Sequence, residues 1–306
     1  MTTQAYLSGA AYELGEHAGA AADLDELLAD PEAAARLLAP EAGFATYHSS
    51  EADVTELMAV AAGKTLAATR VPGTEIDAVV LATDSLPRGR AAHRDVVDLL
   101  ARLSLSNAVA FTVGLMDCAT AVVAVSTAAS MVRDGSCRSV LVLTGDLADR
   151  ATGGSRLVAG GAAVASDAAA AVLVSSAVPG RPVLASARHL SPALARPGVP
   201  PAQQLGLRVR AHRELMQRLA DASPIPPTAV TAVHPSNFAR NVIGLYLADV
   251  GFRPEQLRLG NVSRVAHCLG SDPIVNLADD PGGAGPAILL GSGVAHLAAV
   301  LLGEAA

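Results

Sequence analysis

The chain has 306 residues, of which 51% are hydrophobic and 17% are charged, and its net charge is −7. This composition supports a large buried core and excludes intrinsic disorder. The acidic balance, with a single Lys and no basic run, argues against nucleic acid as a partner.

Location and metal content are constrained by the same sequence. The N-terminus has no basic stretch followed by an apolar core, and no apolar run reaches the roughly 18–20 residues needed to span a bilayer. Three cysteines, an odd number, fit reduced thiols better than a disulfide framework. No Cys or His spacing resembles a zinc site. We therefore expect a cytoplasmic protein without membrane contact or metal.

Helical and strand patterns alternate along the first part of the chain. An opening strand is expected at 4–13, and short acidic helices broken by Pro31 at 23–40. The remaining predicted elements are helices at 51–70, 92–105 and 119–134, and buried strands at 76–85, 139–147 and 167–176.

The second part repeats this alternation. Its predicted elements are a strand from Pro182, a helix at 203–222, the strand AVTAVHPS, a helix at 237–250, the helix IVNLAD and the closing strands AILLGSG and HLAAVLL. A helix and a Pro-containing turn precede a buried strand in each part, as RVPGTEIDAVVLATDS and SPIPPTAVTAVHPSN. We interpret the chain as two duplicated αβ halves, 1–178 and 179–306, packed as one α/β body of five layers.

One stretch, FTVGLMDCATAVVAVSTAASMVR at 111–133, places Cys118 between a strand and a buried helix. Free backbone N–H groups and the positive end of the helix dipole meet at such a turn. They favour the thiolate and can hold an oxyanion, as a nucleophilic cysteine requires. From this stretch alone a small buried hydrophobic residue is the simpler interpretation, because Cys137 and Cys268 look equally inert.

Two further segments carry reactive side chains at element ends. His234 stands in HPSN at the end of a buried strand, and His267 precedes Asp272 in AHCLGSDP. Cys, His and Asp together would supply a nucleophile, a base and an orienting carboxylate. The structural alternatives are that Asp272 caps the following helix ahead of Pro273, and that His234 is a buried core histidine.

Four motifs in the same order resemble β-ketoacyl-acyl-carrier-protein synthase III and its relatives, which have the thiolase fold. They are DCATAVVAVSTAASMVRDGSCRSVLVLTGD, SDAAAAVLVSS, HPSN in place of His-Gln-Ala-Asn, and GSG at 291–293. The resemblance implies that Cys118 accepts an acyl group from a thioester, with the N–H groups of Cys118 and Gly293 as the oxyanion hole. It also implies a homodimer without metal or redox cofactor.

The chain departs from the ketosynthase pattern at one position that matters for chemistry. Where these enzymes carry Asn within Gly-Asn-Thr-Ser, this sequence has His267, and Asn261 in GNVS is the competing match. A His followed five positions later by Asp272 resembles synthase III-like acyltransferases of polyketide and antibiotic pathways, which use Cys-His-Asp without lengthening a carbon chain. Loss of the Asn removes a donor for a thioester enolate, whereas His267 with Asp272 suits a general base.

Three functions follow as hypotheses. The first is an acyltransferase working by ping-pong through acyl-Cys118, with His267 and Asp272 activating the acceptor and His234 assisting. The second is a decarboxylating ketosynthase III that uses Cys118, His234 and Asn261. The third is a silent partner that binds acyl carrier protein. The entrance shows no Trp and no evident Arg clamp for coenzyme A, so a carrier-protein thioester is the expected donor, with coenzyme A as the alternative.

Overall fold

The computed structural model describes residues 3–86, 89–280, 283 and 285–305. The strands are β1 Tyr6–Leu14, β2 His17–Ala20, β3 Thr46–Ser49, β4 Ala78–Ala82, β5 Val109–Val113, β6 Ser139–Asp146, β7 Leu157–Val158, β8 Ala163–Val164, β9 Ala168–Ser175, β10 Arg181–Leu190, β11 Ala232–Pro235, β12 Ala287–Ser292 and β13 His296–Leu302. The helices are α1 Asp25–Ala29, α2 Pro31–Leu37, α3 Val54–Thr69, α4 Arg90–Arg102, α5 Thr120–Arg133, α6 Ala148–Ala151, α7 Pro201–Ala222, α8 Arg240–Asp249, α9 Asn261–Val265 and α10 Asp272–Ala278.

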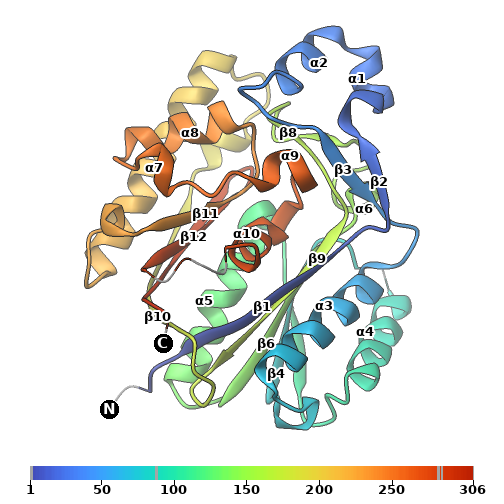
Figure 1. The fold of residues 1–306 in the computed structure, drawn as a ribbon, viewed down its shortest axis with the longest axis vertical. Helices are drawn as coiled ribbons and strands as arrows, with labels where there is room; N and C mark the ends of the chain where they lie inside the picture. The colour runs from blue at the N-terminus through green and yellow to red at the C-terminus, as the bar shows by residue number, and fades with distance from the viewer. Residues whose placement is uncertain (1–2, 87–88, 281–282, 284, 306) are drawn as a thin grey trace.

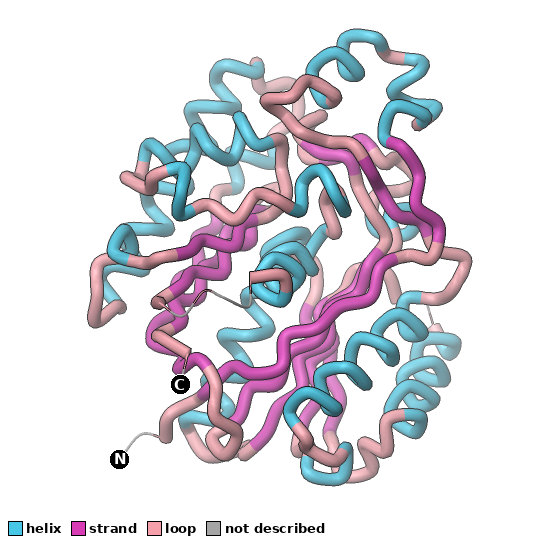
Figure 2. The backbone as a smooth tube through the Cα atoms, in the orientation of Figure 1, coloured by secondary structure: helices cyan, strands magenta, loops and turns pink. Residues whose placement is uncertain are grey.

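The main sheet runs in the order β11-β12-β13-β10-β1-β9-β6-β4-β5. It divides into two groups of strands, because β1 and β10 pair through only Tyr6–Pro182 and Leu7–Arg181. Figure 2 shows these two groups on either side of the central helices. The predicted boundary at 178/179 falls in the loop between β9 and β10, where the chain passes from one group to the other.

The elements stack in five layers, as predicted. Helices α3 and α4 cover the outer face of the first group, α5 and α10 lie between the two groups, and α7 and α8 cover the outer face of the second (Figure 1). Strands β6, β9, β12 and β13 are almost entirely buried, as expected for sheets covered on both faces. Burial of these faces is the main source of stability.

The two halves place equivalent helices in the central layer. Helix α5 precedes β6, which pairs parallel to β4 and antiparallel to β9. Helix α10 precedes β12, which pairs parallel to β11 and antiparallel to β13. The N-termini of α5 and α10 therefore come from different halves of the sequence, and they carry the residues of the candidate site.

Helix α8 begins at Arg240 rather than at the predicted Asn237, and α3 likewise begins three residues later than predicted, at Val54. The N–H of Asn237 donates to Asp272 Oδ2 at 2.6 Å, and its side-chain amide donates to the Ala266 carbonyl at 2.9 Å. Asn237 is therefore held by the segment before α10, so the helix begins only after the chain has passed it.

Within the described ranges, no helix is both long enough and apolar enough to cross a membrane.

Candidate active site

Cys118 lies in a 3₁₀ turn, Asp117–Ala119, that leads directly into α5. Two residues at this turn have a positive φ, which non-glycine residues rarely adopt: 63° at Leu115 and 48° at Asp117. Asp117 Oδ2 accepts a hydrogen bond from the N–H of Val294 at 3.1 Å, which ties the turn to the β12–β13 connection. Unusual backbone of this kind is tolerated where surrounding contacts fix it, and it is common at functional sites.

The structure brings Cys118, His267 and Asp272 into one line of contacts. Cys118 Sγ lies 3.0 Å from Nε2 of His267, and the Nδ1 atom of the same ring is hydrogen-bonded to Asp272 Oδ2. Cys118 is 8% exposed, whereas His267 and Asp272 are fully buried. With its Nδ1–H directed to the carboxylate, the imidazole presents Nε2 to the sulfur, as proton exchange with the nucleophile requires.

Asp272 is oriented by backbone donors as well as by the imidazole. Its Oδ1 accepts the N–H of Cys268 at 2.7 Å, and its Oδ2 also accepts the N–H of Asn237 at 2.6 Å. The alternative that Asp272 serves as the helix cap does not hold, since Ser271 occupies the N-cap position and Asp272 is the first residue of α10. Its carboxylate therefore orients His267 and does not cap α10.

His267 is fixed by its backbone and by ring packing. Its N–H donates to the Val164 carbonyl at 2.9 Å, and its carbonyl accepts the N–H of Ser166 at 2.8 Å. The Phe238 ring packs edge-on against the imidazole, with centroids 5.3 Å apart. Burial lowers the pKa of His267, but the negative charges of Cys118 and Asp272 outweigh it and raise the pKa well above its usual range. This favours the protonated form of His267 beside the sulfur.

Cys118 Sγ and His267 Nε2 face a cavity of about 340 Å³, which we call the inner cavity. Its charged lining consists of Asp84, Asp117, Asp146 and Arg208, in addition to His267. The segment from Leu157 to Gly160 closes one side. A partly enclosed cavity that brings a nucleophile and a base together is suited to covalent chemistry.

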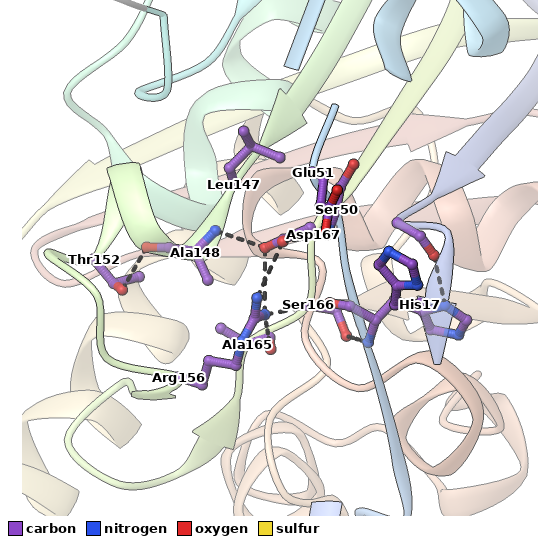
Figure 3. A network of polar contacts seen from close by, with 12 residues as sticks. His17, Ser50, Glu51, Leu147, Ala148, Thr152, Arg156, Ala165, Ser166 and Asp167 are labelled. Carbon is purple, nitrogen blue, oxygen red and sulfur yellow. Dashed lines mark hydrogen bonds and ion pairs between the residues drawn. The ribbon is translucent and has the colours of Figure 1, made fainter. Parts of the chain in front are cut away.

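The closing segment is held by a buried ion pair, shown in Figure 3. Arg156 Nη2 lies 3.1 Å from Asp167 Oδ2, and Asp167 Oδ1 accepts the N–H of Ala148 at 2.7 Å. Arg156 Nη1 also donates to the carbonyls of Ala165 and His48. These contacts fasten the segment between α6 and β9 at the side of the inner cavity.

Comparisons with known proteins show a partial family match and a shared fold. Residues 115–190, about a quarter of the chain, match the family described as 3-oxoacyl-[acyl-carrier-protein (ACP)] synthase III. The chain is synthase III-like. It has the thiolase fold. No curated protein sequence matches it.

Solved structures with this fold cover nearly the whole chain. The synthase III from Aquifex aeolicus VF5 superposes with a TM-score of 0.83 at 17% identity, covering 98% of this chain and all of the other. ChlB3, described as an acyltransferase, superposes with a TM-score of 0.82 at 17% identity, covering 99% of this chain and 98% of its own. The priming β-ketosynthase of the R1128 polyketide pathway gives 0.78 at 16% identity, with 99% and 97% coverage.

The two N–H groups predicted to form the oxyanion hole differ in whether they already make a hydrogen bond. The N–H of Cys118 has no hydrogen-bond partner among the described residues, so it is free to donate. Gly293 lines the inner cavity, but its N–H donates to the His296 carbonyl at 2.8 Å. The structure therefore does not support Gly293 as an oxyanion donor, because the turn between β12 and β13 already uses that N–H.

His234 stands apart from the other predicted catalytic residues. It is fully buried on β11 but does not line the inner cavity, and the charged group facing it is Asp280, 3.8 Å from Nε2. Neither ring nitrogen has a hydrogen-bond partner in the described part of the chain. The catalytic role predicted for His234 thus lacks support, and the core interpretation fits, since a strand alternates its side chains between two faces.

Replacement of His234 by Leu should make the protein less sensitive to acid. Burial lowers the pKa of His234 to about 4, below the ordinary value of 6.5. Between pH 6.5 and pH 4 the unfolded chain binds a proton at His234 and the folded protein does not. The free energy of unfolding therefore falls as the pH decreases through this range, by about 3 kcal/mol at 1.36 kcal/mol per pH unit. Denaturant unfolding at pH 7 and pH 4 measures the difference. Equal losses in parent and variant, or a hundredfold slower acylation in the variant, would contradict this account.

Asn261 would take the place of His267 in the ketosynthase alternative. Its side-chain amide, however, is hydrogen-bonded to residues outside the candidate site. Its Nδ2 donates to Asn276 Oδ1 at 3.0 Å and to Asp279 Oδ2 at 2.9 Å, and its Oδ1 accepts from Arg264. It is absent from the lining of the inner cavity. Its amide is thus unsuited to hold an enolate formed at Cys118.

An outer groove of about 950 Å³ adjoins the inner cavity and shares Ala159, Gly160, Arg208 and Val294 with it. Arg36 and Arg196 also line this groove, and no carboxylate does so among the described residues. Two arginines thus line a groove for which the sequence indicated no evident arginine clamp. Arg36 lies on α2 and Arg196 in the Pro-rich loop before α7, two segments that sequence distance alone does not bring together.

Sequence reasoning assigned no role to four charged residues of the inner cavity, which are Asp84, Asp117, Asp146 and Arg208. Asp146 ends a buried strand, a position where α/β proteins place functional groups, and this was a usable signal. Arg208 had no such signal, because it is one of five arginine and histidine residues on the amphipathic helix α7. Arg208 Nη1 donates to the Gly293 carbonyl at 2.6 Å, a contact that depends on tertiary packing.

Proposed function

We propose that the protein is an acyltransferase of secondary metabolism that moves an acyl group from a carrier-protein or coenzyme A thioester, through acyl-Cys118, to an acceptor. No carbon–carbon bond forms. The observation that carries the proposal is the placement of His267 between Sγ and Asp272, with Nε2 3.0 Å from the sulfur. A braced imidazole at this position is a general base and acid.

The first half-reaction would load the enzyme. The thiolate of Cys118 attacks the thioester carbonyl, and the N–H of Cys118 donates to the developing oxyanion. As the tetrahedral intermediate collapses, the bond to the donor sulfur breaks and the donor thiolate takes a proton from the His267 imidazolium. The products are acyl-Cys118, a neutral imidazole and the free donor thiol, so charge and protons balance.

The second half-reaction would use the neutral imidazole as a base. His267 accepts the proton of an acceptor hydroxyl, thiol or amine as that atom attacks the acyl carbonyl. The bond to Sγ then breaks, and Cys118 leaves as a thiolate paired with the imidazolium. The starting pair is regenerated. No metal or redox cofactor is required by these steps.

The other two hypotheses fit the site less well. A decarboxylating ketosynthase would need donors for a thioester enolate, and neither His234 nor Asn261 lines the inner cavity. A silent partner would have no use for a buried imidazole aligned between sulfur and carboxylate, because burying polar groups costs stability unless they are paired. The geometry supports acyl transfer.

The outer groove is the proposed path of the donor's phosphopantetheine arm, with acyl carrier protein as the partner. Arg36 and Arg196 are exposed cations at this groove and suit an anionic ligand.

Reversal of both charges should weaken donor binding selectively. The double variant Arg36→Glu/Arg196→Glu is expected to raise KM for a carrier-bound thioester about 10-fold, equivalent to about 1.4 kcal/mol. An N-acetylcysteamine thioester, which lacks the phosphate, should be unaffected. Arg94→Glu, on the exposed face of α4, serves as the matched control. Equal effects on both thioesters would argue against this path.

A homodimer is also proposed. Strand β5 ends the main sheet, and Val109 at its start is 69% exposed, while Leu115 beyond its end is 89% exposed. An unprotected sheet edge with exposed apolar side chains favours pairing with another chain. Sedimentation equilibrium tests this directly.

The test of the function itself is to trap the acyl-enzyme. Incubation with a panel of carrier-bound acids, followed by intact-mass analysis, should show one acyl group added and mapped to Cys118. The absence of any adduct with every donor would favour a non-catalytic role.

A further inference from the structure

Asp146 is a second buried carboxyl group in the inner cavity, separate from the Cys-His-Asp line. It is the last residue of β6 and is 6% exposed. Its Oδ1 accepts three hydrogen bonds, from Thr83 Oγ1 at 3.1 Å, Ser85 Oγ at 2.9 Å and the N–H of Asp84 at 2.9 Å. One oxygen of the carboxyl group is thus rigidly held.

The other oxygen, Oδ2, is directed differently. It accepts no hydrogen bond from the described residues and is not sealed from the cavity that Asp146 lines. It faces Gly270, where a Cβ atom would lie 3.7 Å away, so no side chain covers it from that side. Burial raises the pKa of Asp146 to about 7, so the carboxylate form, in which Oδ2 is a hydrogen-bond acceptor, predominates above that pH. An acceptor that opens onto the cavity and has no hydrogen-bond partner among the described residues can accept a hydrogen bond from a group bound there.

The position of Asp146 indicates which substrate group would reach it. Arg208 and Val294 belong to both the outer groove and the inner cavity, whereas Asp146 and Asp84 belong to the inner cavity alone. A donor arm in the groove would leave its acyl group on Sγ inside that cavity. When the arm departs and an acceptor enters by the groove, the acyl group is the part that stays beside Asp146.

We propose that Asp146 Oδ2 accepts a hydrogen bond from the acyl group, so that the enzyme selects acyl groups bearing a hydroxyl or amino donor. This inference rests on the proposed function and names the substrate class for it. An acyl group ending in a carboxylate is disfavoured, because three carboxyl groups and one guanidinium line the cavity. A site built around a hydrogen bond discriminates strongly against analogues that lack the donor.

The competing role for Asp146 is to hold the segment Thr83–Ser85 through Oδ1. Asp146→Asn separates the two roles. Because all three groups around Oδ1 donate, the amide oxygen would take that position and the NH₂ group would face the cavity. The structural contacts would then survive, while the acceptor offered to the substrate would become a donor.

The experiment measures the rate of acyl-Cys118 formation by intact mass with pantetheine thioesters of three kinds. They are butyryl, butyryl with a hydroxyl on carbon 2 or 3, and the corresponding methoxy compounds, which accept but do not donate. The parent should load at least one hydroxyacyl group 10-fold faster or more than butyryl and methoxybutyryl. This comparison needs no variant, so it does not depend on how a substitution folds.

Asp146→Asn should reduce that preference, measured as the ratio of the two rates within the variant, to about 1. Asp77→Asn is the matched control, because Asp77 Oδ2 accepts the N–H groups of Arg138 and Ser139 at the other end of β6. An equal rate for all thioesters in the parent, or an unchanged preference in Asp146→Asn, would overturn the inference and leave the acyltransferase proposal standing. No adduct with any thioester would overturn both.

Discussion

Cys118→Ala should remove the acyl adduct and lower transfer by at least about 10³-fold, the scale of losing a covalent nucleophile. The sulfur is the one reactive atom that faces the inner cavity in contact with His267. Alanine differs by that atom alone and lies at a position where the turn and α5 need no hydrogen bond from the side chain. Intact-mass analysis after incubation with a donor thioester measures the loss.

The other two cysteines provide the controls. Cys137 is half-buried beyond the far end of α5, and Cys268 is buried next to His267 in the sequence. Burial raises the pKa of Cys268 well above its usual range, so this thiol is poorly nucleophilic despite its position. Cys137→Ala and Cys268→Ala should retain the adduct. An adduct that persists in Cys118→Ala and maps to Cys268 would contradict the assignment of the nucleophile.

His267→Ala should slow transfer from acyl-Cys118 to the acceptor by about 10²–10⁴-fold, the usual range for a general acid–base group. Some self-acylation should remain, because the turn at the start of α5 still favours the thiolate. Single-turnover decay of preformed acyl-enzyme, with and without acceptor, separates the two half-reactions. A variant that transfers at the parent rate would show that another group is the base.

Asp272→Asn gives a graded version of the same test. The amide oxygen can accept only one of the two N–H groups that Asp272 now binds, that of Cys268 at Oδ1 or that of Asn237 at Oδ2. The substitution removes the negative charge that orients and stabilises the imidazolium of His267. Transfer should fall by less than in His267→Ala, and the pH at which transfer becomes half-maximal should decrease, since Asp272 helps to raise the pKa of His267.

The sequence predicted the layered fold well because its elements are strongly patterned. The buried strand 139–147 and the uninterrupted apolar helix 119–134 correspond to β6 and α5 within one residue. Local rules are sufficient where period, length and breaker residues agree. They failed at the start of α8, because Asn237 is held by contacts with Ala266 and Asp272, which lie about 30 residues further along the chain.

The candidate site was predictable in part for the same physical reason. His267 and Asp272 are five positions apart and meet through one turn, so their pairing is a local property. The direction in which His234 points depends on strand register, and the occupied N–H of Gly293 depends on the geometry of a hairpin turn. Arg208 reaches Gly293 from a helix 85 positions earlier, and only the packing of layers reveals it.

The most direct test of the central claim is to give preformed acyl-enzyme a malonyl carrier labelled at its free carboxylate. The site described here should release no labelled carbon dioxide above the rate without enzyme and should form no β-ketoacyl product, while the acyl group still leaves Cys118 when an oxygen, sulfur or nitrogen acceptor is added. Release of one carbon dioxide per acyl group, with a β-ketoacyl product, would contradict acyl transfer and establish decarboxylative condensation.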